Sequence, residues 1–151
     1  MLLTALIHPD LLRALAAAGH GARVLVADGN YPVSTETPPG AEKIYLNLRR
    51  GLIGAAEVLE VLVESIPVES ALVMEGPDGK PGPLQDRYRR ILPPRVPLSG
   101  RKRLEFYQEA KSAATAVVIT TGEERPFANI LLTIGVNRRG DAGAGPPAAA
   151  T

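Results

Sequence analysis

The 151-residue chain contains no cysteine, which excludes disulfide bonds, thiolate catalysis and cysteine-based zinc sites. It also lacks any run of about 18 apolar residues, the length that a membrane-spanning helix needs. The apolar residues 1–7 have no basic region before them and are followed by His8-Pro9-Asp10, so they do not resemble a signal peptide. These absences lead us to expect a cytoplasmic protein.

Neither sign of charge is in excess, because 17 Lys and Arg side chains are matched by 16 Asp and Glu side chains. Domains that bind nucleic acids or anionic membranes usually carry a clear basic excess. A glycine-rich phosphate-binding loop is also absent, which disfavours a nucleotide-handling α/β domain. We therefore expect neither nucleic acid nor membrane as a partner, and no metal ion or other cofactor.

Short apolar segments of strand type alternate with helical patterns along the chain. Strands are predicted at residues 24–27, 43–47, 70–74, 116–120 and 129–134, and helices at 9–18, 53–64, 84–92 and 104–115. Continuous apolar strands are typical of sheets that are covered on both faces. The alternation predicts an α/β fold: a single domain with a largely parallel sheet flanked by helices.

The predicted domain covers residues 1–136. Residues 137–151 are rich in glycine, proline and alanine, and we expect them to form a flexible tail. Two further segments rich in turn-forming residues, 33–42 and 76–83, are expected to be exposed loops. Loops of this length often serve as lids or contact surfaces.

The first predicted strand, residues 24–27, has a histidine on one side and an aspartate on the other. His20 lies between two glycines that permit a sharp turn after the preceding helix. Asp28 follows the strand at its carboxyl end, where open α/β sheets bind ligands. Taken alone, this pattern more often reflects a helix-end contact for the histidine and a turn cap for the aspartate.

Five segments in order, covering residues 1–136, resemble the sugar mutarotase family of D-ribose pyranase and L-fucose mutarotase. They are His8-Pro9-Asp10-Leu11-Leu12; Gly19-His20-Gly21 with Asp28 and Pro32; Asp86-Arg87-Tyr88-Arg89; Arg103-Leu104-Glu105-Phe106-Tyr107; and Thr121-Gly122-Glu123 with Phe127-Ala128-Asn129 and Gly135. The segment from Arg103 resembles the fucose branch more than the ribose branch. This chain departs from the family pattern at Phe127, where a tyrosine is usual, and by about two extra residues between Tyr107 and Gly122, so Arg103 is matched by motif and not by spacing.

The resemblance implies an isomerase, a mutarotase that interconverts the anomeric forms of a reducing monosaccharide such as L-fucose without a cofactor. His20 would be the general acid/base, a role that suits imidazole because both of its protonation states are accessible near neutral pH. The resemblance places the sugar against Asp28, Arg103, Phe127, Ala128 and Asn129. It also implies a homo-oligomer, a ring or decamer, with sites at subunit boundaries to which a neighbour donates the Asn129 segment.

Two alternatives stay open at this point. The protein could be a D-ribose pyranase, which interconverts pyranose and furanose forms. It could also be a non-catalytic sugar-binding protein, because Phe127 lacks the phenol hydroxyl. Tyr31 and Tyr107 lie near matched motifs, and either could replace that hydroxyl.

Structural roles are expected for most of the other polar side chains. His8 precedes a proline at a helix start and is predicted to be structural. Residues 87–90 are expected to form a solvated helix face or a subunit contact, and Glu57, Glu60 and Glu64 an exposed helical stripe. Glu123 and Glu124 are interpreted as solvated turn residues.

Overall fold

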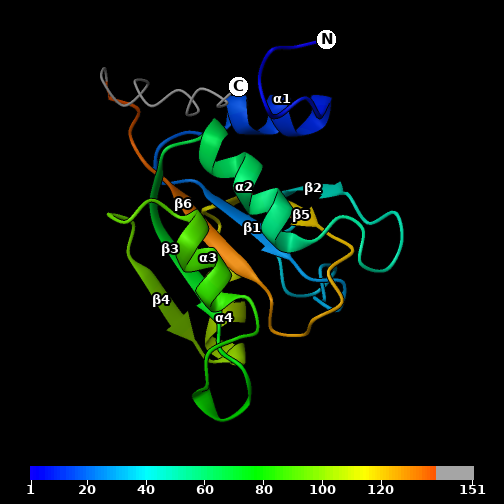
Figure 1. The fold of residues 1–151 in the computed structure, drawn as a ribbon, viewed down its shortest axis with the longest axis vertical. Coiled ribbons are helices and arrows are strands. Elements are labelled where there is room, and N and C mark those ends of the chain that lie inside the picture. The colour runs from blue at the N-terminus through cyan, green and yellow to red at the C-terminus, as the bar shows by residue number, and fades with distance from the viewer. Residues whose placement is uncertain (139–151) are drawn as a thin grey trace, which may run out of the picture.

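The computed structural model describes residues 1–138, which form an α/β domain around one six-stranded sheet (Figure 1). The helices are α1 (Pro9–Ala17), α2 (Ala55–Ser65), α3 (Gln85–Ile91) and α4 (Arg103–Ala110), with a short 3-10 helix η1 (Pro77–Gly79). The strands are β1 (Arg23–Ala27), β2 (Glu42–Tyr45), β3 (Val68–Met74), β4 (Leu98–Arg101), β5 (Thr115–Thr120) and β6 (Ile130–Ile134). The predicted tail lies mostly outside the described residues.

The sheet is mixed but mostly parallel, with the strand order β2-β5-β1-β6-β3-β4. Strand β6 runs antiparallel to both of its neighbours, β1 and β3, while the other pairs are parallel. Five strands therefore point in one direction, and their carboxyl ends meet at one edge of the sheet. Because β6 runs the other way, its first residues lie at that same edge.

Both faces of the sheet are buried, as the apolar strands predicted. Alternate residues of β1 belong to different cores: Val24 and Val26 to the core beneath α1, α2 and α3, and Leu25 and Ala27 to the core beneath α4. Figure 1 shows α2 and α3 in front of the sheet and α4 behind it. All four of these β1 side chains are fully buried.

The predicted elements are confirmed with three differences. Strand β4 was not predicted, because its sequence contains a glycine and follows a proline; it is an edge strand, where such residues are tolerated. Helix α4 ends at Ala110 and not at 115, since Ser112 forms a turn that accepts hydrogen bonds from Ala114 and Thr115. The loop at residues 33–42 is not wholly exposed, because Thr37 and Ala41 are buried.

Candidate functional site

Five of the six predicted site residues lie at the carboxyl edge of the sheet. Asp28 follows β1 directly, and Arg103 is the first residue of α4, just after β4. Phe127, Ala128 and Asn129 immediately precede β6, whose antiparallel direction brings them to this same edge. Segments separated by about a hundred residues in sequence are joined here, as the hydrogen bonds between Asp28 and Asn129 demonstrate.

Asp28 and Asn129 form a buried reciprocal pair. The backbone N–H of Asp28 donates to Asn129 Oδ1 at 2.8 Å, and Asn129 Nδ2 donates back to Asp28 Oδ2 at 2.9 Å. Oδ2 also accepts the backbone N–H of Ala128 at 3.2 Å, and Oδ1 accepts that of Asn30 at 2.9 Å. Both residues are only 3% exposed. The amide of Asn129 is thus used to hold Asp28 in place.

Burial raises the pKa of Asp28 above its ordinary value, because a charged carboxylate is poorly solvated there. The hydrogen bonds from Asn30, Ala128 and Asn129 act in the opposite direction, since they stabilise the charged form. A carboxylate has about four acceptor positions, and three donors fill only part of that capacity. Asp28 Oδ1 accepts one of these hydrogen bonds and so has an acceptor position left.

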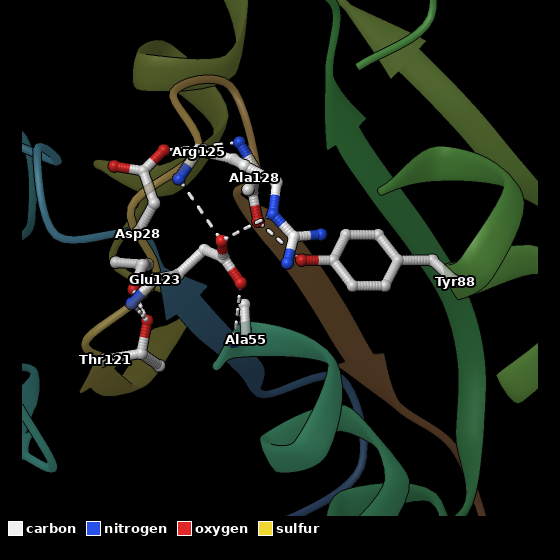
Figure 2. A network of polar contacts seen from close by, with 8 residues as sticks. Asp28, Ala55, Tyr88, Thr121, Glu123, Arg125 and Ala128 are labelled. Carbon is white, nitrogen blue, oxygen red and sulfur yellow. Dashed lines mark hydrogen bonds and ion pairs between the residues drawn. The ribbon is translucent and has the colours of Figure 1, made fainter. Parts of the chain in front are cut away.

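A second polar network surrounds the segment before β6 (Figure 2). The hydroxyl of the buried Tyr88, on α3, donates to the carbonyl of Ala128 at 2.6 Å. Glu123 is also buried: its carboxylate accepts the N–H of Ala55 at the start of α2 and forms an ion pair with Arg125 at 3.1 Å. The interpretation of Glu123 as a solvated turn residue is therefore wrong, as is that of Tyr88 as part of a solvated helix face, whereas Glu124 is exposed as expected.

Aromatic side chains flank the pair on the α4 side of the sheet. Phe127 and Tyr107 are partly buried and pack against the core beneath α4, and Tyr31 contacts Tyr107 edge-on at a centroid distance of 5.4 Å. Phe127 has a φ of 63°, which L-residues rarely adopt, so its ring direction is set by an unusual backbone. A phenylalanine at this position contributes an apolar ring without a hydroxyl.

The two nearby tyrosines differ in the use of their hydroxyls. Tyr31 donates to the carbonyl of Glu36 at 2.9 Å, so its hydroxyl is already engaged. That of Tyr107 makes no hydrogen bond within residues 1–138. Partial burial raises the pKa of Tyr107, while the positive charge of Arg103 acts to lower it. Of the two tyrosines considered from sequence, Tyr107 is therefore the one that can offer a phenol to a ligand.

A cleft of about 630 Å³ adjoins this edge. Gly29 and Asn30 contribute to it directly after Asp28, and residues 121–124 form another wall. Arg49 and Arg50 also line it, and neither is a residue that the sequence singled out. The loop that carries them is held close by a hydrogen bond from the Gly51 N–H to the Gly122 carbonyl, 2.7 Å long.

His20 lies at the opposite edge of the sheet. It precedes β1, whereas Asp28 follows it, and the five residues of the strand between them span about 13 Å at ~3.3 Å per residue. The imidazole is exposed, and its Nε2 contacts Glu69 Oε2 at 3.1 Å. The chain therefore does not bring His20 together with the other five predicted site residues.

The structural roles predicted for His8 and for the three glutamates of α2 are confirmed. His8 is the N-cap of α1, and its Nδ1 accepts the Leu11 N–H at 3.3 Å, which confirms a structural role. Glu57, Glu60 and Glu64 are exposed, as predicted. None of the helices within residues 1–138 is long and apolar enough to cross a membrane. Over the same range, no cluster of three or more histidine and acidic side chains could hold a metal ion.

Residues 1–137 match the model of the RbsD / FucU transport protein family. The chain belongs to this family. D-ribose pyranase of Paracidovorax citrulli is 35% identical over 133 residues, which cover 88% of this chain and 96% of that protein. Fucose mutarotase of Bos taurus is also 35% identical, over 145 residues that cover 87% and 90% of the two chains.

The fold agrees with solved structures of the RbsD / FucU family. Bacillus subtilis RbsD complexed with D-ribose superposes with a TM-score of 0.77 at 26% identity, covering 91% of this chain and all (100%) of that one. Relatives named for both activities match equally well, so the similarity establishes a sugar pyranase and mutarotase family without favouring either sugar.

Proposed function

We propose that the protein is a sugar mutarotase, an isomerase that interconverts the anomeric forms of a reducing monosaccharide. The observation that carries this proposal is the carboxylate of Asp28, held by Asn129 beside Phe127 and Tyr107 at the carboxyl edge of the sheet. A fixed acceptor next to aromatic rings suits a sugar, which presents hydroxyl donors on its rim and C–H groups on its faces.

In this proposal each of the predicted binding residues has a distinct role. Asp28 accepts a sugar hydroxyl at its remaining acceptor position, and Arg103 at the start of α4 supplies donors. The ring of Phe127 covers an apolar face of the sugar. Ala128 presents its backbone, and Asn129 holds Asp28 in position and lines the pocket.

The reaction needs a proton carrier, and His20 is the proposed one. Removal of the proton from the anomeric hydroxyl and delivery of a proton to the ring oxygen break the bond between the anomeric carbon and that oxygen. The open-chain aldehyde forms, turns about its neighbouring carbon–carbon bond, and recloses by the reverse proton transfers. An imidazole can perform both transfers near neutral pH and is regenerated at the end of the cycle.

His20 and Asp28 can act on one sugar only if they come from different copies of the chain, because β1 separates them within one copy. We therefore propose a homo-oligomer in which the carboxyl edge of one subunit faces the amino edge of its neighbour. Such a head-to-tail contact is heterologous and closes into a ring, of which two can stack into a decamer.

The choice of sugar is a separate part of the proposal. The segment from Arg103 to Tyr107 supports an L-fucose-like substrate, because it resembles the fucose branch of the family more than the ribose branch. D-ribose is the second candidate, since the D-ribose pyranase relative is as similar as the fucose mutarotase relative. Pyranose–furanose exchange uses the same ring opening and differs only in which hydroxyl closes the ring.

Nuclear magnetic resonance exchange spectroscopy on L-fucose and D-ribose tests these proposals together. We expect the wild-type protein to accelerate exchange between ring forms of one sugar, and His20→Ala to lose about 10²–10⁴-fold of that acceleration. Binding detected by saturation transfer without acceleration would instead identify a non-catalytic sugar-binding protein. Full activity in His20→Ala would contradict the role of His20.

A further inference from the structure

A groove of about 620 Å³ lies at the amino edge of the sheet, around His20. Besides His20, it is lined by the charged side chains of Glu69, Arg95 and Arg138, and by Gly135. Within this groove the contact between His20 Nε2 and Glu69 Oε2, at 3.1 Å, is the single side-chain hydrogen bond to the imidazole in residues 1–138.

The contact depends on three neighbouring strands. His20 precedes β1 and Glu69 is the second residue of β3, and β6 lies between these two strands in the sheet. The two side chains therefore meet across the end of β6, where the next residue is Gly135. A Cβ at Gly135 would lie 3.3 Å from the Cβ of Glu69, so the absence of a side chain leaves room for Glu69.

Backbone hydrogen bonds fix both partners. The N–H of Gly21, directly after His20, donates to the carbonyl of Ile134 at 2.9 Å. The N–H of Gly135 donates to the carbonyl of Pro67, two residues before Glu69, at 2.8 Å. Gly21 has a φ of 82°, which a side chain would disfavour. The backbone hydrogen bonds of Gly21 and Gly135 thus fix the positions of the segments that carry His20 and Glu69.

We propose that Glu69 is a positioning residue for His20, an inference that rests on the proposed role of His20 in sugar ring opening. A carboxylate can only accept a hydrogen bond, so the contact fixes the proton of the neutral imidazole on Nε2. Nδ1 is then the unprotonated nitrogen, free to take the proton from the anomeric hydroxyl. When Nδ1 gains that proton, Glu69 faces a cation and stabilises it.

Nitrogen-15 NMR of the histidine rings tests the tautomer directly. The chain has two histidines, and His8 caps α1 far from Glu69 in sequence, so it serves as an internal reference. We expect the Nε2-protonated form of His20 to predominate in the wild type and in Glu69→Gln, whose amide oxygen also accepts a hydrogen bond. In Glu69→Ala the population of this form should fall to the smaller excess that a free neutral histidine side chain shows, while the signals of His8 stay unchanged.

Kinetics by exchange spectroscopy provides the second readout. Glu69→Ala should lower kcat by roughly 10–100-fold, the usual effect of removing a group that orients a catalytic histidine. KM should change by less than about twofold, because Glu69 does not contact the sugar in this proposal. Glu69→Gln keeps a hydrogen-bond acceptor but loses the charge, so its kcat should lie between those of the wild type and Glu69→Ala. Glu64→Ala removes an exposed carboxylate of α2 outside this groove and is the matched control.

The outcomes separate this inference from the proposed function. If the wild type and Glu69→Ala show the same kcat and the same His20 tautomer, while His20→Ala is inactive, only the role of Glu69 is overturned. If the wild type itself does not accelerate exchange, the proposed function fails, and with it the catalytic role of Glu69. Loss of kcat in Glu69→Gln equal to that in Glu69→Ala would also contradict the inference.

Discussion

The two edges of the sheet hold their polar groups in opposite ways. At the carboxyl edge Asp28 and Asn129 are buried, and the backbone supplies two of the donors to the carboxylate. At the amino edge the side chains of His20 and Glu69 are 59% and 54% exposed, and within residues 1–138 they hydrogen-bond only to each other. The first arrangement fixes an acceptor within the fold, and the second presents the proposed proton carrier on a surface. A surface group of this kind suits a site that a neighbouring subunit completes.

The largest expected difference between the edges is in stability. Asn129→Ala leaves the buried Asp28 N–H without a partner and removes one of the two hydrogen bonds to Asp28 Oδ2, so it should lower the free energy of unfolding by about 1–3 kcal/mol. His20→Ala should change it by less than about 0.5 kcal/mol, as surface substitutions usually do. Denaturant unfolding measures both values.

The control for that experiment is Asn137→Ala, which removes an exposed asparagine beyond the other end of β6. It should leave the free energy of unfolding unchanged. Equal losses of unfolding free energy in Asn129→Ala and His20→Ala would contradict the proposal that the polar groups of the carboxyl edge contribute more to stability than those of the amino edge.

A second prediction concerns the phenol hydroxyl that Phe127 lacks at the carboxyl edge. If Tyr107 supplies the hydroxyl that Phe127 lacks, Tyr107→Phe should reduce kcat/KM by about 2–10-fold, the worth of one hydrogen bond. Phe127→Tyr should restore activity to Tyr107→Phe, but alone it should change kcat/KM by less than about twofold, because Tyr107 already makes that hydrogen bond. Exchange kinetics on the preferred sugar provides the measurement.

Tyr31→Phe is the matched control, because the hydroxyl of Tyr31 already donates to Glu36. Its kcat/KM should stay within about twofold of the wild-type value. A larger loss of kcat/KM in Tyr31→Phe than in Tyr107→Phe would show that Tyr31, and not Tyr107, supplies the phenol.

The smallest expected effect is a pH dependence from Asp28. Burial raises its pKa in the folded protein above the ordinary value of 3.8, so the folded state holds this proton more tightly than the unfolded chain does. The stability contributed by Asp28 therefore falls as the pH rises from its unfolded pKa through its folded pKa, and is constant above. Asp28→Asn does not titrate, so unfolding free energies of the two proteins between about pH 3 and about pH 7 should show the wild type losing stability relative to the variant. A relative gain over this range would contradict the raised pKa.

Sequence patterns predicted the sheet strands that are apolar and continuous, because burial on both faces leaves a clear signal. They missed β4, whose edge position allows proline and glycine beside it. They also placed Asp28 correctly at a strand end, since the turn chemistry is local. The pairing of Asp28 with Asn129 depends on β6 inserting antiparallel between β1 and β3, which no local pattern encodes.

The contacts of Tyr88 and Glu69 were missed from the sequence for the same reason, because they depend on tertiary packing. Tyr88 lies in a run of arginines that reads as a solvated face, and only the tertiary packing of α3 turns its hydroxyl toward Ala128. Glu69 belongs to a strand whose neighbour is set by topology, so its contact with His20 could not be predicted from spacing. The family resemblance brought His20 and Asp28 together as site residues, and the structure separates them within one chain.

Co-expression of His20→Ala with Asp28→Asn tests the central proposal most directly, since each variant keeps the edge that the other has lost. If sites form between subunits, random mixing in one oligomer should restore about a quarter of the sites, those that pair an intact His20 with an intact Asp28. The anomer exchange rate should then recover to about a quarter of the wild-type rate, while each variant alone stays inactive. No recovery in oligomers shown by native mass spectrometry to contain both variants would contradict a site shared between two copies of the chain.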